Sequence, residues 1–396
     1  MQTIRKLITG SAAAAVLAAV AATPAVAAAT AQAAPASHAG PNDPSAGTVP
    51  REGDIVGVGA DTDEFLLDQF SHDYNASHST SAHLLYSWDA TNPATGAVGD
   101  SIKTKSGCST IPRPDGSSAG ITAFDANAKT SDKKDFCIDY ARSARGRSST
   151  DPPKAAGGIV FVELAKDAIT YTTQATTNAP GNLTTAQLAS IYNCVDANWS
   201  QVGGKSAPIH AFLPNPAESG MAKSFLTMIG VTSPGSCVNQ TIQQNEGINS
   251  LLKDPDAIVP YSIAKYIAQR YHSAKCLKSS CAPVSGVECK PAAGKNLFGC
   301  DEHGTLALNS VNGTVPTTGT APNVTINPSF SATFFNPIYD VVRFSGSTPD
   351  NIPSTLEPLF AAATAKVKGW ACGNKKATTD IKHYGFLTTP LCGIGF

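Results

Sequence analysis

Residues 54–62 have the sequence Asp-Ile-Val-Gly-Val-Gly-Ala-Asp-Thr, in which a β-branched run ends in a small polar loop. Phe65, Leu66, Gln69 and Phe70 then follow at helical spacing. This pattern predicts a strand, a loop and a helix. A chain that repeats this unit is expected to build an α/β fold around a sheet.

Two further strands of this kind are predicted at residues 83–88 and 136–140, and the second leads into a loop at residues 141–146. Residues 113–121, Arg-Pro-Asp-Gly-Ser-Ser-Ala-Gly-Ile, form a Gly/Ser loop ahead of a helix predicted from Ile121. Backbone N–H groups and hydroxyls at a helix start bind anions directly, although an ordinary connection would have the same composition. Ligands of open α/β sheets bind at the carboxyl ends of strands, so these loops predict one shared site.

The second half of the chain continues with strands and helices of the same type. Asn182 begins a helix with a Thr cap signal that extends to Tyr192, and a further helix contains Phe225 and Leu226. A run at 335–342 is expected to cross back to the first half. The other predicted elements are strands at 158–162, 168–172, 209–213, 257–262 and 305–309, and helices at 263–271 and 353–370.

The first residues are typical of a secretory signal peptide. Arg5 and Lys6 precede a long Ala/Val run that has small-residue cleavage sites near Ala27 and Ala33. Residues 1–33 are therefore predicted to be removed on export. Residues 34–49 are rich in Ala, Pro, Ser and Gly and are expected to form a flexible leader. The first cysteine is Cys108, which leaves no site for a lipid anchor, so the protein is expected to be secreted and extracellular.

The ten cysteines of an exported chain favour disulfides over thiol or zinc chemistry. Many pairings are possible, and pairing between sequential neighbours is the expected one. All ten are predicted to be disulfide-bonded: Cys108, Cys137, Cys194, Cys237, Cys276, Cys281, Cys289, Cys300, Cys372 and Cys392.

Composition allows a large core and excludes one partner class. Hydrophobic residues make up 42% and charged residues 15%, as in one or two globular domains. The formal net charge is −1, and it becomes −3 when Arg5 and Lys6 leave with the signal peptide. Such a chain has no basic surface for nucleic acid, so no nucleic-acid partner is expected.

Taken in order, the loops resemble those of the phosphate-binding, substrate-binding proteins of ABC transporters, which have the type 2 periplasmic-binding-protein-like fold. The most specific part is the run at residues 183–192 followed by Asn198 and Trp199. The other residues that carry the resemblance are 59–62, 116–120, 138–143, 218–220 and 258–261.

The resemblance implies an α/β protein of two lobes, each a mixed sheet flanked by helices, with a ligand cleft between them. Lobe I would comprise residues 50–158 and 333–396. Lobe II would comprise residues 159–332, including a Cys-rich insertion at 275–303. The implied ligand is a small inorganic or organic oxyanion, the implied partner is the membrane component of an ABC transporter, and a monomer without a cofactor is expected.

By position, the resemblance implies that the oxyanion is held by hydroxyls and backbone N–H groups. The implied ligand-binding residues are Thr62, Ser117, Ser118, Ser143, Ser219 and Gly220. Five or six charge-assisted hydrogen bonds of about 1.5–3 kcal/mol each would offset the desolvation of a small anion.

Two departures from the family pattern bear on selectivity. The Arg that the family carries before its second-lobe Gly-Ser-Gly-Thr is missing from residues 214–221, and the family's Asp falls on Ala144. Arg142 and Arg145 either supply the missing positive charge or are solvated loop charges. Altered selectivity between phosphate and sulfate is therefore expected.

Two other functions remain alternatives. The same fold with a degenerate ligand site would serve as an extracellular scaffold or adhesion protein. A secreted hydrolase is less favoured, because the chain has no Gly-x-Ser-x-Gly elbow, and no catalytic residue or metal ligand is predicted. His210 is interpreted as a core residue of an apolar strand. The acidic residues at 61, 63 and 64 are expected from the helix dipole alone.

Overall fold

The computed structural model describes residues 49–78, 83–92, 96–272, 281–284, 288–291, 303–321, 323–348, 350–362 and 369–396. All of these residues belong to the unit Ser37–Phe396. The predicted signal peptide and nearly all of the predicted leader lie outside the described residues, as does most of the Cys-rich insertion. Among the described residues, no helix combines the length and the apolar character needed to cross a bilayer.

A mixed sheet forms the centre of this unit, with the strand order β2-β1-β5-β16-β6-β9-β8 and with β12 also paired to β6. β1 is parallel to β2 and β5, whereas β16 is antiparallel to both β5 and β6. The strands are β1 (Ile55–Gly59), β2 (Leu85–Ser87), β5 (Tyr140–Ser143), β6 (Ile159–Gln174), β8 (His210–Ala211), β9 (Ala257–Ser262), β12 (Leu306–Leu308) and β16 (Phe335–Arg343). The predicted α/β class and mixed sheet are confirmed.

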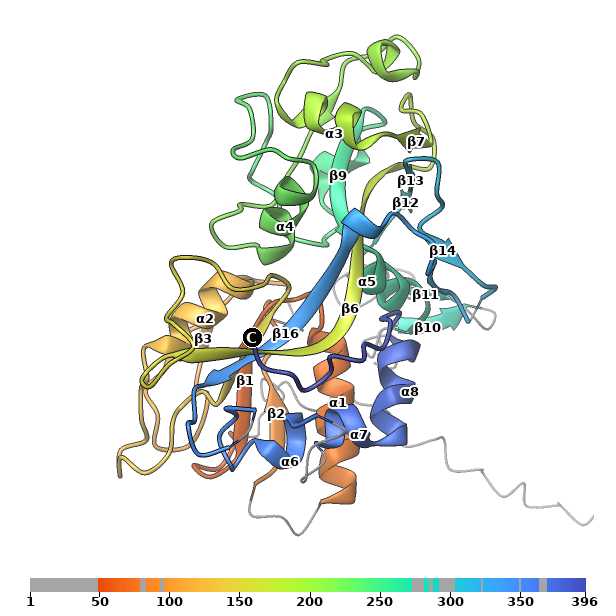
Figure 1. The fold of residues 1–396 in the computed structure, drawn as a ribbon. Coiled ribbons are helices and arrows are strands. Elements are labelled where there is room, and N and C mark those ends of the chain that lie inside the picture. Colours follow the sequence, from red (N-terminus) through yellow and green to blue (C-terminus); the bar gives the residue numbers. More distant parts are fainter. Residues whose placement is uncertain are drawn as a thin grey trace, which may run out of the picture. The chain divides into compact units, whose positions relative to one another are not determined.

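The predicted strands at 158–162 and 168–172 are one continuous strand, β6, so the prediction of two separate strands is wrong. β6 pairs first with β16 and then, from Ile169, with β9. One strand therefore joins the part of the sheet formed by β2, β1, β5 and β16 to the part formed by β9 and β8 (Figure 1). Charged residues interrupt the apolar pattern in its middle. One of them, Asp167, accepts a hydrogen bond from the Ala264 N–H at 3.0 Å.

The helices cover both faces of the sheet. Side chains alternate along a strand, so Ile55 packs with Phe65 and Phe70 of α1, whereas Val56 packs in a second cluster with Ile121 of α2. β1 is therefore buried on both faces, as its uninterrupted apolar sequence requires. The helices are α1 (Glu64–Ser77), α2 (Ser117–Asp125), α3 (Thr185–Tyr192), α4 (Gly220–Met228), α5 (Ile263–Ile267), α6 (Glu357–Phe360), α7 (Trp370–Gly373) and α8 (Lys375–His383).

The predicted cap of the helix at 182–192 is confirmed. The Thr184 hydroxyl accepts from the Gln187 N–H at 3.2 Å, and the Gln187 side-chain oxygen accepts from the Thr184 N–H at 2.9 Å. This capping box satisfies two N–H groups that the first turn leaves without helical partners.

Several predicted boundaries are wrong. The helix expected from Ile121 already begins at Ser117, and the helix expected from Asn182 begins at Thr185, because Asn182 and Leu183 form the strand β7. The third strand was expected at 136–140 with a loop after it, but β5 spans Tyr140–Ser143, because these residues pair with β16. The single helix expected at 353–370 is replaced by α6 and α7. α6 ends at Phe360 because Ala361 is extended, with ψ 153°.

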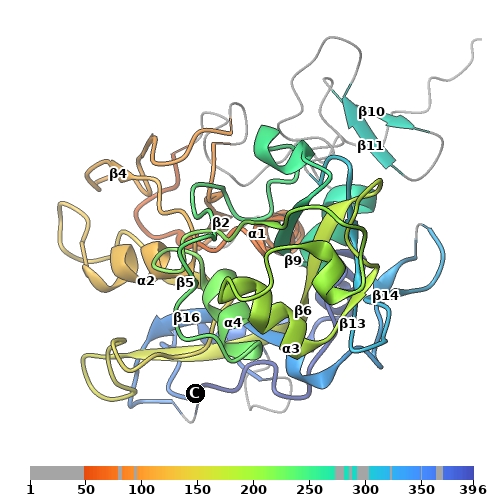
Figure 2. The ribbon, with the colours of Figure 1, turned by 90° about the horizontal axis from the view of Figure 1, so that it is seen from above.

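Smaller elements complete the described residues. Figure 2 shows β10 and β11 apart from α2 and α4. The two-stranded sheets pair β3 (Ser101–Ile102) with β4 (Ile111–Pro112), β7 (Asn182–Leu183) with β13 (Ser310–Val311), β10 (Cys281–Val284) with β11 (Glu288–Pro291), and β14 (Thr317–Thr318) with β15 (Thr325–Ile326). The short helices are η2 (Trp199–Val202), η3 (Ser250–Lys253), η4 (Ala268–His272) and η6 (Ala332–Phe334).

Three of the expected disulfides are confirmed. They join Cys108 to Cys137, Cys194 to Cys237 and Cys372 to Cys392. The other two expected pairs involve cysteines 276, 281, 289 and 300, whose side chains lie outside the described residues.

Candidate ligand-binding site

The candidate site lies where loops from residues 50–158, here called the first segment, meet loops from residues 159–332, the second segment. The lobe boundaries on which this division rests stay a prediction. β1 ends at Gly59, where φ is +120° and the backbone lies close to Arg142; an added side chain would lie 2.6 Å from the Arg142 main-chain oxygen. This close approach brings Asp61 and Thr62 to the end of the sheet.

Arg142 is fully buried and holds the ends of three strands together. Its guanidinium donates to the Ala60 carbonyl at 2.8 Å, to the Trp88 carbonyl at 2.7 Å and to the Ser87 hydroxyl at 2.5 Å. Its Nε also lies 4.0 Å from Asp63 Oδ1. All of these contacts are with groups of the protein. Neither role expected for Arg142, a positive charge for the ligand or a solvated loop charge, includes them.

Arg145 belongs to a second group of contacts, with Ser118 and Ser143. The Arg145 guanidinium pairs with both oxygens of Asp151 at 2.7 and 2.9 Å. Its Nε donates to the Ser118 hydroxyl at 3.3 Å, and the Ser143 hydroxyl donates to the Arg145 carbonyl at 2.8 Å. Ser118 also lines a separate cavity of about 630 Å³ with mainly apolar walls around α2.

The N-termini of α2 and α4 meet at the junction of the two segments. The Ser118 N–H donates to the Glu218 carbonyl at 3.2 Å, and a side chain at Gly220 would collide with the Ser117 hydroxyl. The Ser219 hydroxyl caps α4 by accepting from the Ala222 N–H at 3.0 Å. The positive ends of two helix dipoles therefore lie together, an arrangement that favours negative charge.

Ala144 occupies the position of the family's Asp and is buried beside these helix starts. Its N–H donates to the Ser117 hydroxyl at 3.0 Å. Its carbonyl accepts from the Ser224 hydroxyl of α4 at 3.2 Å and from the Asn336 amide of β16 at 2.8 Å. The backbone of this residue thus connects the two segments, although its side chain has no polar group.

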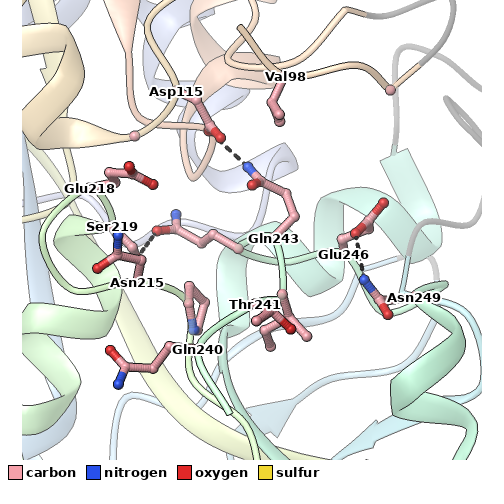
Figure 3. A pocket seen from close by; sticks show the side chains of 15 residues that line it. Val98, Asp115, Asn215, Glu218, Ser219, Gln240, Thr241, Gln243, Glu246 and Asn249 are labelled. Carbon is pink, nitrogen blue, oxygen red and sulfur yellow. Dashed lines mark hydrogen bonds between the residues drawn. The ribbon is translucent and has the colours of Figure 1, made fainter. Parts of the chain in front are cut away.

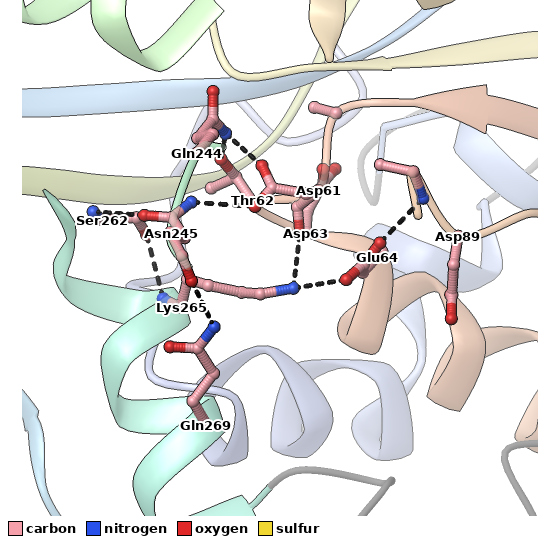
Figure 4. A network of polar contacts seen from close by, with 12 residues as sticks. Asp61, Thr62, Asp63, Glu64, Asp89, Gln244, Asn245, Ser262, Lys265 and Gln269 are labelled. Atoms are coloured by element: carbon pink, nitrogen blue, oxygen red, sulfur yellow. Dashed lines mark hydrogen bonds and ion pairs between the residues drawn. The ribbon is translucent and has the colours of Figure 1, made fainter. Parts of the chain in front are cut away.

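Gln244 joins two of the predicted ligand residues, Ser219 and Thr62, and its contact with Thr62 can be followed in Figure 4. Its amide nitrogen donates to the Thr62 hydroxyl at 3.0 Å and to Asp61, while its amide oxygen accepts from the Ser219 hydroxyl. Gln244 as a whole is 6% exposed. The structure therefore brings Thr62 and Ser219 to one carboxamide, a contact partner that the sequence patterns did not indicate.

A buried ion pair lies on the other side of Asp61. The Lys265 ammonium, at the start of α5, donates to Glu64 Oε1 at 2.6 Å and to the Asp61 carbonyl at 2.8 Å. Asn245 donates to Asp61 Oδ2 at 3.1 Å. Burial raises the pKa of Asp61 to about 7, although the Lys265 ammonium opposes this shift.

A polar cavity of about 410 Å³ opens beside Ser219 and Gln244 (Figure 3). Its walls come from both segments and carry amides, hydroxyls and three carboxylates. The lining residues are Gly96, Val98, Asp115, Gly116, Pro214, Asn215, Glu218, Ser219, Gln240, Thr241, Ile242, Gln243, Gln244, Glu246 and Asn249. In the sequence, the amide-rich run at 240–245 is the feature that could have indicated this cavity. Because the run has no helical or strand periodicity, it does not by itself predict a binding site.

His210 does not lie in the core, so its interpretation as a core residue is wrong. Its side chain is 48% exposed and pairs with Asp254, because β8 has only two residues and lies at the edge of the sheet. In the part of the chain that the structure describes, no three His, Cys, Asp or Glu side chains are grouped to hold a metal ion.

A family model described as a PBP superfamily domain matches residues 80–296, which is more than half of the chain. The chain belongs to the PBP superfamily. No curated protein sequence matches this PBP superfamily member.

Solved structures of similar fold include two bacterial proteins that are described as components of phosphate transport. One is a candidate phosphate ABC transporter substrate-binding protein with bound phosphate from Clostridium perfringens, with a TM-score of 0.50 and 13% identity over 85% of this chain and 99% of that chain. Another is an ABC-type phosphate transport receptor from Vibrio cholerae, with a TM-score of 0.48 and 16% identity over 85% of this chain and 100% of that chain. With the family match, the first likeness confirms the expected type 2 periplasmic-binding-protein-like fold.

Proposed function

We propose that this PBP superfamily member is a substrate-binding protein that captures a small, phosphate-like oxyanion where its two segments meet. The observation that carries the proposal is the meeting of the α2 and α4 N-termini, with Ser117 and Ser219 at the two helix starts. Helix starts offer N–H groups and a favourable dipole to an anion. The similar structure from Clostridium perfringens, which is a candidate phosphate ABC transporter substrate-binding protein with bound phosphate, supports the same ligand class.

Gln244 defines how the anion would enter. The Ser219 hydroxyl already donates to the Gln244 carboxamide oxygen, whereas the Thr62 hydroxyl accepts from the carboxamide nitrogen and keeps its own proton. An oxyanion can accept from both hydroxyls once the carboxamide leaves. Binding therefore exchanges an intramolecular contact for a ligand contact, and the ligand must compete with the protein's own side chain.

Replacing Gln244 by Ala is expected to raise the affinity for phosphate or sulfate by about tenfold, because the hydrogen bond that holds the Ser219 proton disappears. Isothermal titration of both proteins with each anion measures the effect. Gln240→Ala is the matched control, because Gln240 lines the same cavity but is exposed. Absence of heat with both anions in the wild type and in Gln244→Ala would rule out the proposed function.

Sulfate affinity is expected to rise as the pH falls from 8 to 6. Asp61, which faces Lys265, Glu64 and Asp115, has a pKa raised to about 7 by burial, so its repulsive charge disappears over this range. The gain is at most about tenfold for each pH unit, the limit for uptake of one proton. Titrations across this range measure it. Asp61→Asn should abolish the dependence, and a wild-type affinity that is flat or rises with pH would contradict the placement of Asp61 beside the anion.

The proposed role extends to export and transport. Residues 1–33 have the pattern of a signal peptide, and the family resemblance implies delivery of the ligand to an ABC importer. We propose that the protein works outside the cell as a monomer without catalytic activity. Pull-down of a membrane permease from cells grown without phosphate would test the transport step separately from ligand binding.

One observation favours a second candidate function, an extracellular scaffold on the same fold. Thr62, Ser143 and Ser219 all have hydrogen-bond partners within the protein, and Arg142 and Arg145 are paired as well. A scaffold needs no open ligand site. A thermal-shift panel of oxyanions separates the two functions, because only the binding protein gains stability with ligand concentration.

A further inference from the structure

A cavity of about 310 Å³ lies at the opposite end of α2 from the candidate site. Asp125, the last residue of α2, lines this cavity, whereas the candidate site lies at the helix start, Ser117. The cavity shares no lining residue with the one beside Ser219. Its volume is within the range of roughly 300–1,000 Å³ that is typical of pockets for organic ligands. It is therefore large enough for a small organic ligand of its own.

The Arg343 guanidinium is fixed in the wall of this cavity by three hydrogen bonds and two rings. Its Nε donates to Asn127 Oδ1 at 2.8 Å, its Nη1 to the Ile138 carbonyl at 2.8 Å and its Nη2 to the Phe124 carbonyl at 3.1 Å. Its Cζ lies 3.5 Å from the centre of the Phe136 ring and 4.2 Å from that of Phe124. A guanidinium has five N–H donors, so one N–H on each terminal nitrogen has no acceptor among the described residues.

The positive charge of the wall comes from two side chains, Arg343 and Lys129. In the part of the chain that the structure describes, neither of them is paired with a carboxylate. Asp139 is paired with Lys105 at 2.6 Å instead. Burial lowers the pKa of Arg343 to about 10, although the carboxylates of Asp139 and Asp125 oppose this shift. A bound anion would oppose it in the same way.

The other groups of the wall select among anions. Asp125 adds a carboxylate to the two cations, so the charged side chains of the wall have a net charge of +1. Such a wall attracts anions and favours a monoanion over a dianion such as hydrogen phosphate. Phe344 and Ile159 supply apolar surface on which an aromatic ring packs well. The chemistry therefore favours a carboxylate attached to an aromatic ring.

We propose that this cavity is a second ligand site, which binds a small aromatic carboxylate. The two carboxylate oxygens accept from the remaining Nη1 and Nη2 N–H groups of Arg343, a paired geometry that suits a planar guanidinium. Lys129 adds attraction from the same wall, and the ring of the ligand packs against Phe344 and Ile159. The site does not depend on the proposed oxyanion capture, because the two cavities have no lining residue in common.

Isothermal titration with benzoate and benzyl alcohol tests this assignment, because the two probes share a ring and differ in the carboxylate. Benzoate is expected to bind at least about tenfold more tightly, since it adds charge-assisted hydrogen bonds. Arg343→Lys keeps the charge but not the planar fork, and it should lower the affinity for benzoate by at least about tenfold.

Two further variants give effects of opposite sign. Lys129→Gln removes an attractive charge and should lower the affinity for benzoate about two- to fivefold, whereas Asp125→Asn removes a repulsive charge and should raise it by a similar factor. Neither variant should change the affinity for benzyl alcohol. Lys103→Gln is the matched control for Lys129→Gln, because Lys103 is also exposed but does not line the cavity.

The outcomes separate the second site from the proposed function. Equal affinities for benzoate and benzyl alcohol, or no binding of benzoate, would overturn the second site. Equal losses in Lys129→Gln and Lys103→Gln would overturn it as well, because they indicate unspecific attraction to the surface. Tighter binding by Asp125→Asn would support it, since damage to the fold does not strengthen binding. A wild-type protein that binds benzoate but not phosphate would contradict oxyanion capture and leave the second site standing.

Discussion

Replacing Arg142 by Met is expected to lower the free energy of unfolding by about 3–5 kcal/mol, the usual cost of removing one partner of a buried charged pair. The substitution leaves Asp63, which is fully buried, without the guanidinium 4.0 Å away. It also removes the donors to the Ala60 and Trp88 carbonyls. Denaturant titration measures the loss.

Arg51→Met is the control for this experiment. Arg51 pairs with Asp54, but its side chain is 59% exposed, so the loss should stay below about 1 kcal/mol. Arg142→Lys keeps the charge but cannot form the planar fork, and it should recover only part of the stability. An Arg142→Met variant of wild-type stability that no longer binds phosphate would contradict this interpretation and make Arg142 a ligand residue.

Replacing Lys265 by Met is expected to destabilise the protein by about 3–5 kcal/mol as well. Lys265 and Glu64 are buried and pair at 2.6 Å across the two segments, and the substitution leaves Glu64 without its cation. The double variant Lys265→Met/Glu64→Gln should be more stable than Lys265→Met alone, because it also removes the buried carboxylate charge that Lys265 no longer balances. Denaturant titration of the wild type, Lys265→Met, Glu64→Gln and the double variant gives the coupling energy.

Lys376→Met serves as the matched control for this double-mutant cycle. Lys376 pairs with Asp73 and Asp380, but its side chain is 54% exposed, so its loss should cost about 1 kcal/mol or less. Strictly additive losses for Lys265 and Glu64 would show that their ion pair does not couple the two segments.

Elements that are determined by residues close together in the sequence could be predicted from it. β1 and α1 follow from an apolar run and a helical repeat, and the start of α3 follows from Thr184 and Gln187, three residues apart. The sequence predicts two strands in place of the single strand β6, because charged residues interrupt its apolar pattern. Asp167 is accommodated there by the N–H of Ala264, a residue 97 positions away, which no local window contains.

The site was predicted in part for the same reason. Gly/Ser loops at helix starts are visible in the sequence, so the meeting of α2 and α4 involves residues already singled out as ligand candidates. Gln244 lies in an amide-rich loop without periodicity, and its bond to Thr62 spans 182 residues. The role of Arg142 depends on carbonyl groups, which every residue carries and which sequence patterns therefore do not mark. Whether the predicted residues hold an anion stays a prediction that the titrations test.

The placement of the three described disulfides has a consequence for ligand access. Cys108–Cys137 lies within the first segment, Cys194–Cys237 lies within the second, and Cys372–Cys392 lies within the last residues of the chain. Each shortens the unfolded chain locally, and none of the three ties the first segment to the second. The described contacts between the two segments at the candidate site are instead reversible hydrogen bonds, such as those from Gln244 to Thr62 and from Asn245 to Asp61, and the ion pair of Lys265 with Glu64. In an oxidising medium, these bonds can therefore part and re-form around a ligand without any thiol chemistry.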